Sequence, residues 1–227
     1  MLAIELFEIN HHRAEEMLKA HQGASPKGRP VEKTFMPDLL RAVVVFAAAA
    51  LDAYLAMKVV QTVNAICFKK KRFPEKAVGY FVRGDGEAND VKNGAKIARD
   101  LLAIATSDNP RKLLVRRLEV ALKRTTFQNP EQVSHALAIM EVECPWPKLD
   151  KSLVSTRGKK RRGKPLSSEV FLREFIERRN DIVHEGDVYT SFKHHGQLKP
   201  ITRTWVRESL QKLKRMVIEI ERISQVV

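Results

Sequence analysis

The sequence has only two cysteines, Cys67 and Cys144, among its 227 residues. They lie far apart and form neither a CxxC motif nor a metal-ligand spacing, which argues against a disulfide framework. Unpaired cysteines are typical of a reducing compartment, so we expect a cytoplasmic protein. Glycine and proline number ten each, and aromatic residues make up 7% of the chain. The shortage of strand-favouring aromatics favours helices over strands.

The chain also lacks the patterns of a secreted or membrane-spanning protein. Its first eight residues have neither the basic start nor the apolar run of a signal peptide. The most apolar stretch, residues 42–51, is followed by Asp52 and Lys58 and is too short to cross a bilayer. We therefore expect a soluble protein with no membrane partner, in which this stretch is a buried helix.

Acidic residues are scarce relative to basic ones: 27 Asp and Glu stand against 41 Lys and Arg, for a net charge of +14. A field of this size attracts polyanions and speeds their encounter with the protein. Nucleic acid is the first partner to consider, and an anionic membrane surface or a ribosome is the second.

Helical periodicity recurs along the chain and predicts an all-α fold. Asn109-Pro110 and Asn129-Pro130 are good helix starts, and the last helix has a single apolar stripe of Val206, Leu210, Leu213, Val217 and Ile220. We predict one domain over residues 1–227, with a helical insertion at 73–150. The predicted helices cover about 3–20, 39–68, 91–106, 111–126, 130–143, 167–184 and 202–223.

Two segments concentrate positive charge. The helix at 111–126 has a basic face, and residues 151–164 contain seven basic residues and no acidic one, so we predict a basic surface loop at 151–166. A charge run of this kind could equally be a solvated segment or a nuclear-import signal. The residues that we expect to contact RNA are Arg116, Arg117, Lys159, Lys160, Arg161, Arg162 and Arg178.

The segment from Leu172 to Gly186 carries the candidate chemistry. On a helical wheel, Arg179 falls in the middle of an apolar face, where a guanidinium needs an acid or a phosphate beside it. Asp52 is the acid that we expect to pair with it, although Asp52 could also turn to solvent. Asn180 and His184 are i,i+4 neighbours, so the amide can steer the imidazole.

A purely structural explanation of these residues stays open. Arg179 could pair with a core acid for stability alone, and His184 could favour the negative end of its helix.

Arg179-Asn180-Asp-Ile-Val-His184 resembles the R-x4-6-H motif of the HEPN superfamily in its Arg-Asn-x-x-x-His form, and Arg178 offers the five-residue spacing. Leu51-Asp-Ala-Tyr-Leu55 resembles an early HEPN helix, and residues 130–149 resemble the segment before the motif in RiboL-PSP-type HEPN proteins. The motif helix also comes late, with a glycine soon after it and a long amphipathic helix at the end. The resemblance covers most of residues 37–225 and implies a HEPN-type helical bundle with extra helices inserted before the motif helix.

The resemblance implies a ribonuclease in which two copies pair through the motif helix as a homodimer. One histidine per chain supplies both the base for the 2′-hydroxyl and the acid for the leaving 5′-oxygen only if two chains contribute. The implied catalytic set is Arg179, Asn180, His184 and Asp52, acting without a cofactor and leaving 2′,3′-cyclic phosphate ends. We expect a toxin or antiviral defence effector, for which an antitoxin or regulatory protein is a candidate partner. The alternative is a non-catalytic HEPN module that binds RNA or a partner protein.

No metal site is expected from the sequence. The pairs His11-His12 and His194-His195 have no ligand partners at helical spacing. The segment Asp85–Asp90 lacks the glycine and the final acid of a calcium loop.

Overall fold

The computed structural model describes residues 1–23, 35–69, 72–77, 102–123, 125–127, 129–153, 167–189 and 196–225. Within these ranges the chain is helical and has no strand, apart from an isolated antiparallel bridge between Val188 and Leu198. The predicted all-α fold is confirmed. The longer helices are α1 (Ala3–Gly23), α2 (Phe35–Lys69), α5 (Pro110–Leu122), α6 (Pro130–Ile139), α7 (Pro145–Leu153), α8 (Ser168–His184) and α9 (Arg203–Ile223).

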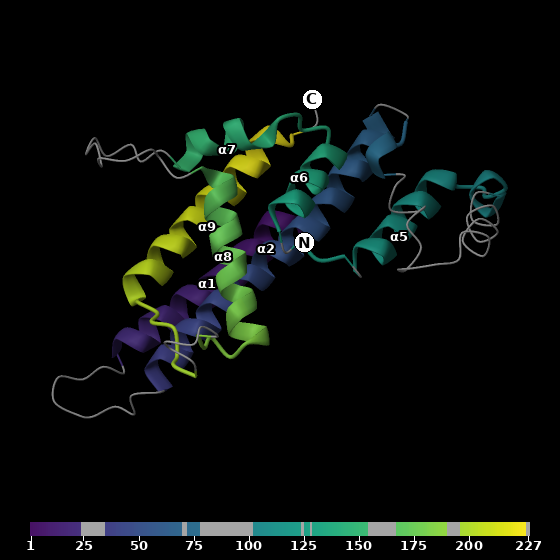
Figure 1. The fold of residues 1–227 in the computed structure, drawn as a ribbon. Helices are drawn as coiled ribbons and strands as arrows, with labels where there is room; N and C mark the ends of the chain where they lie inside the picture. Colours follow the sequence, from purple (N-terminus) through teal and green to yellow (C-terminus); the bar gives the residue numbers. More distant parts are fainter. Residues whose placement is uncertain are drawn as a thin grey trace.

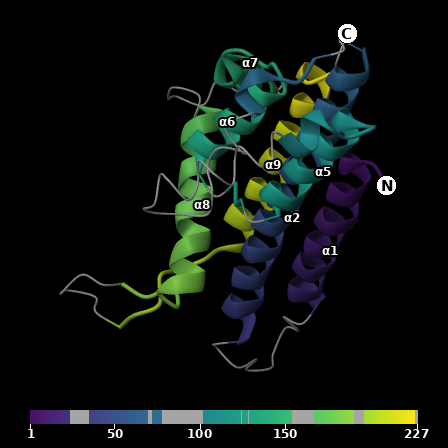
Figure 2. The same cartoon turned by 90° about the vertical axis from the view of Figure 1, so that its right-hand side faces the viewer.

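Helix α2 is the central element, as its apolar composition predicts. It contacts α1, α5, α6, α8 and α9, and Figures 1 and 2 show it running alongside α1, with α8 at an angle to it. Its buried positions include Val43, Val44, Leu51, Leu55 and Val59. Because these side chains point to several neighbours at once, the helix has no single apolar face, in contrast to a surface helix.

By length and composition alone, Met36–Lys69 could also cross a membrane. Half of its most apolar window is buried inside the fold. Contacts with five other helices account for this composition in a core helix.

Helix α9 packs against the core through one stripe of apolar residues. All five apolar residues predicted for that stripe are buried. Polar contacts fix its register: the Tyr54 hydroxyl donates to Glu221 at 3.1 Å, and Lys58 Nζ donates to the same carboxylate at 2.7 Å. Burial of Tyr54 raises the pKa of its phenol, and the neighbouring Glu221 charge adds to that shift. The phenol therefore stays a donor.

The two predicted asparagine-proline helix starts are confirmed, and one helix was missed. Asn109 and Asn129 cap α5 and α6, each with proline next in sequence. Both helices end about four residues earlier than predicted. Helix α5 ends at Leu122, and Phe127 after it is buried in the core. Helix α6 ends at Ile139, and Glu141 after it has φ of 62°.

The missed helix is α7, because Cys144-Pro-Trp-Pro147 was interpreted as a segment end. Proline fits the first turn of a helix as well as it breaks an interior, and both prolines lie in the first turn of α7. Lys151 therefore lies in a helix, not in the predicted basic loop, and the rest of that loop from 154 to 166 falls outside the described residues. Of the helix expected at 91–106, only 102–106 are described; 102–105 are helical and Thr106 lies in a turn.

The described part of the predicted insertion shares the main core. Leu118, Phe127, Leu137 and Leu149 belong to one hydrophobic cluster with residues of α2, α8 and α9. The division of the chain into a HEPN core and an insertion stays a prediction.

Candidate functional site

Hydrogen bonds hold the N-terminus of helix α8, and this anchoring positions the motif residues later in the helix. The Ser167 side chain accepts the backbone N–H of Val170, and Asp150 of α7 accepts the backbone N–H of Ser168 at 2.6 Å. These bonds satisfy two of the N–H groups that a helix start leaves open. Phe171, Leu172, Phe175 and Ile176 are then buried against the core.

At the other end, α8 stops where the sequence predicts. The carbonyl of Asp181 accepts the N–H groups of both Glu185 and Asp187 at 3.0 Å. Gly186 has φ of 62°, the left-handed conformation that glycine adopts without strain. His184 is the last helical residue and its side chain is exposed.

The motif residues are only partly brought together. Arg179 and Asn180 are half-buried, and Arg179 Nη1 donates to Asn180 Oδ1 at 3.0 Å. The Asn180 carbonyl therefore orients the guanidinium and not, as we expected, the His184 imidazole. Val183, one residue before His184, is 46% exposed. The apolar face of α8 thus ends before the motif, and Arg179 lies at its margin.

Asp52 lies near Arg179 but is held by a different group. Its Oδ1 accepts the backbone N–H of Phe127 at 2.5 Å. Burial raises the pKa of the Asp52 carboxyl, while the Phe127 N–H and the positive charge of Arg179 oppose that rise. The expected direct ion pair with Arg179 is not formed in the structure, so the two side chains interact through space.

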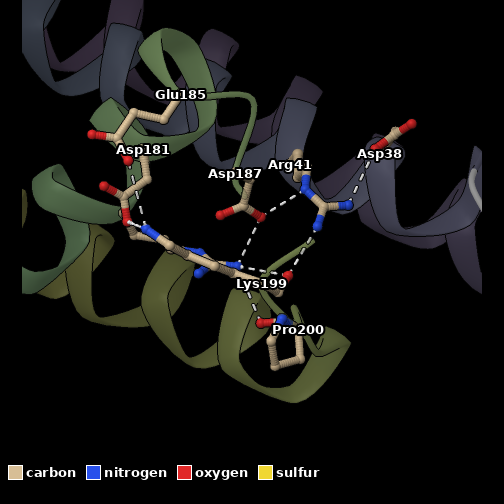
Figure 3. Close-up of polar contacts among 8 residues, drawn as sticks. Asp38, Arg41, Asp181, Glu185, Asp187, Lys199 and Pro200 are labelled. Atoms are coloured by element: carbon tan, nitrogen blue, oxygen red, sulfur yellow. Dashed lines mark hydrogen bonds and ion pairs between the residues drawn. The ribbon is translucent and has the colours of Figure 1, made fainter. Parts of the chain in front are cut away.

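The strongest charge cluster of this region involves other residues (Figure 3). The Asp187 side chain is fully buried and its Oδ2 accepts Arg41 Nε at 2.7 Å and Arg178 Nη2 at 2.8 Å. Arg41 comes from α2 and is also buried. It donates further to Asp38 at 3.1 Å and to the Lys199 carbonyl at 2.9 Å. The Asp187 carboxylate thus links the end of α8 to α2 through Arg178 and Arg41. Both arginines also donate to the Lys199 carbonyl in the segment that leads into α9.

A second ion pair closes the same region. Lys199 Nζ donates to Asp181 Oδ2 at 2.6 Å, and the Lys199 N–H donates to the Asp187 carbonyl at 2.7 Å. The Arg178 Nη2 reaches the carbonyls of Lys199 and Pro200 at 3.2 and 3.1 Å. Arg178 Nη2 is therefore bound to protein acceptors, and the direct RNA contact that we expected of Arg178 stays a prediction.

Sequence reasoning missed Arg41 and Asp187, although a signal for the first existed. Arg41 is a lone cation near the start of the apolar half of α2, the same pattern that drew attention to Arg179. Asp187 follows a glycine in a loop and gave no such signal.

The other expected RNA contacts divide into two groups. Arg116 is exposed on α5 and Arg117 is half-buried there. The loop residues Lys159, Lys160, Arg161 and Arg162 lie outside the described residues, as do the discounted segments Asp85–Asp90 and His194-His195.

His11 is not a surface residue, and its role is structural. It is buried, and its Nε2 lies 3.1 Å from the Leu210 carbonyl, which can only accept, so Nε2 carries the proton. Among the residues that the structure describes, no three His, Cys, Asp or Glu side chains gather as a metal site would require.

Comparisons of the chain with protein-family models, with curated proteins and with solved structures found no match.

Proposed function

We propose that this protein is a metal-independent RNA endonuclease of the HEPN type that works as a cytoplasmic homodimer. The observation that carries the proposal is the exposed His184 at the firmly anchored end of α8, one turn after the joined pair Arg179 and Asn180. A histidine in that position can reach a ligand outside its own chain while its backbone stays fixed. The net charge of +14 supplies the attraction for RNA.

The proposed chemistry uses two copies of His184. One imidazole takes the proton of the 2′-hydroxyl, whose oxygen attacks the adjacent phosphorus. The second imidazole protonates the leaving 5′-oxygen, so that a 2′,3′-cyclic phosphate and a 5′-hydroxyl form. Arg179, oriented by Asn180, stabilises the charge that develops on the phosphate. Asp52 acts on Arg179 through its charge.

The test is a cleavage assay on single-stranded RNA with 5′-end labelling and analysis of the product ends. His184→Ala should reduce the rate by up to about 10⁴-fold, since it removes both acid and base. His12→Ala is the matched control, because His12 is another exposed helix histidine and should leave the rate unchanged. Equal rates in His184→Ala and the wild type rule out the mechanism.

One observation favours the alternative, a non-catalytic HEPN module that binds RNA or a partner protein. No hydrogen bond or ion pair within the described chain orients the His184 imidazole. The alternative predicts RNA binding by wild type with no cleavage at any enzyme concentration, so the same assay separates the two. The role of toxin or defence effector, with an antitoxin as partner, is part of the proposal and is tested by expressing wild type and His184→Ala in growing cells.

A further inference from the structure

A groove lies between the C-terminal end of α2 and helix α5, away from the motif helix. Its volume is about 520 Å³, and its lining includes Asn64, Phe68, Arg111, Lys112, Arg116 and Glu119. Figure 1 shows α5 set to one side of the bundle, and it packs against α2. The groove is therefore a site separate from the α8 motif.

The groove contains the most exposed aromatic side chain among the described residues. Phe68 is 82% exposed, whereas its neighbours Ile66 and Cys67 are buried. Phenylalanine is among the residues most often found inside proteins, and a solitary exposed ring beside a polar groove is available for stacking. Its place at the last turn of α2 keeps the ring on a fixed backbone.

The charges of the lining favour an anion. Arg111, Lys112 and Arg116 face the groove against one acid, Glu119. None of these three cations has an acidic partner at ion-pair distance within the described part of the chain. The first turn of α5 adds the partial positive charge of a helix N-terminus, although the Asn109 side chain already caps the N–H of Lys112. Arg111 lies close enough to lower the pKa of the Cys67 thiol, against the larger effect of burial, which raises it.

We propose that this groove binds a single-stranded segment of RNA, with a base stacked on Phe68 and the flanking phosphates held by Arg111, Lys112 and Arg116. An exposed ring combined with a cationic groove is how proteins hold unpaired nucleotides, because every base has a face that can stack. A duplex has no free base face to offer. A flat bilayer surface cannot reach the lining of a concave groove. The ligand class rests on the proposed function, but binding can be measured without cleavage.

The test measures binding of a fluorescent oligouridylate of about ten nucleotides, a length typical of such grooves, in the full-length His184→Ala background to prevent cutting. Phe68→Ala should weaken binding about 5- to 150-fold, the effect of losing one stacked base, and Phe68→Trp should retain it. Arg116→Gln should weaken binding and flatten the dependence of log K on log salt by about 0.7. The controls are Ile218→Ala and Arg215→Gln, two exposed positions on α9.

Each result of this binding assay either supports or overturns the proposal that the groove binds single-stranded RNA. Phe68→Ala that binds the oligonucleotide as tightly as Ile218→Ala overturns the groove, even if wild type cuts RNA. The proposal is also overturned if Phe68→Ala weakens the binding of single-stranded and duplex RNA equally, or if it weakens only the binding of vesicles that contain phosphatidylserine. A loss confined to single strands supports the groove, and it does so even if wild type proves unable to cleave, which would refute the proposed nuclease alone.

Discussion

Replacing Asp187 by asparagine tests whether the buried ion cluster holds the end of α8. The carboxylate is fully buried between Arg41 and Arg178. Asparagine has nearly the same shape and keeps one acceptor oxygen, but it removes the charge. It also tolerates the left-handed backbone found here, where Asp187 has φ of 60°. The substitution therefore changes the electrostatics with little strain.

The expected loss follows from the contacts. A hydrogen bond to a charged group contributes about 1.5–3 kcal/mol, and removing one partner of a buried pair costs about 3–5 kcal/mol. Arg41 would keep Asp38 and the Lys199 carbonyl, and Asp187 Oδ1 has no partner among the described residues. Both facts favour the lower range, so we expect Asp187→Asn to cost about 2 kcal/mol. In a chain of this length that loss lowers Tm by about 4–8 °C.

Urea denaturation measures this loss directly, with Asp108→Asn as the control, since Asp108 is exposed. Asp187→Ala should cost about 1 kcal/mol more than Asp187→Asn, because alanine adopts the left-handed region less readily. A change below about 0.5 kcal/mol in Asp187→Asn, the usual size of a surface effect, would show that desolvation cancels the ion pairs and that the cluster does not anchor α8.

The remaining predictions concern the proposed site. Asp52→Asn should stabilise the protein at neutral pH, because the raised pKa of the Asp52 carboxyl means that the folded state disfavours its charge. The wild type should therefore gain stability as pH falls, and the melting temperatures of wild type and Asp52→Asn should converge in acid. Arg179→Ala should abolish cleavage while Arg215→Ala does not, as gel assays would show. Cleavage should persist in EDTA and fail on RNA with a 2′-deoxy group at the scissile nucleotide. Neutralising residues 159–162 should weaken RNA binding and make it less dependent on salt, without changing the ends of the cleavage products. Light scattering should show a dimer at micromolar concentration, and an active monomer would contradict the two-histidine mechanism.

The fold was predictable where local chemistry was strong. Asparagine-proline pairs start α5 and α6, and the periodic stripe of α9 is buried along its whole length. Helix ends were harder because tertiary contacts decide them. Phe127 leaves the helical path for the core, and its N–H finds Asp52, which lies 75 residues away in the sequence.

The candidate site was predictable as a segment but not as a set of contacts. Spacing along one helix identifies Arg179, Asn180 and His184, because i,i+1 and i,i+4 relations are local. It cannot identify Asp187 as the residue that anchors the helix, since the partners of Asp187 are 146 and 9 residues away. Nor could it say that Asn180 bonds Arg179 instead of His184, a choice made by side-chain rotamers.

Arg178 and Arg179 show this limit of local reasoning most directly. They are adjacent and identical in type, and either one satisfies the spacing to His184. Successive helical residues point about 100° apart, so only one of them can face the α2 side of the fold. Arg178 takes that side and is held by Asp187 and two carbonyls, which leaves Arg179 with Asn180 at the margin of the core. The buried Asp187 carboxylate balances the charge of Arg178 and holds its guanidinium on that side. Arg179 is therefore the arginine that we propose for the chemistry. Arg178→Ala should lower stability more than Arg179→Ala, with the reverse order for cleavage. Thermal melts beside the cleavage assay compare the two, and the same order in both measurements would refute this division of roles.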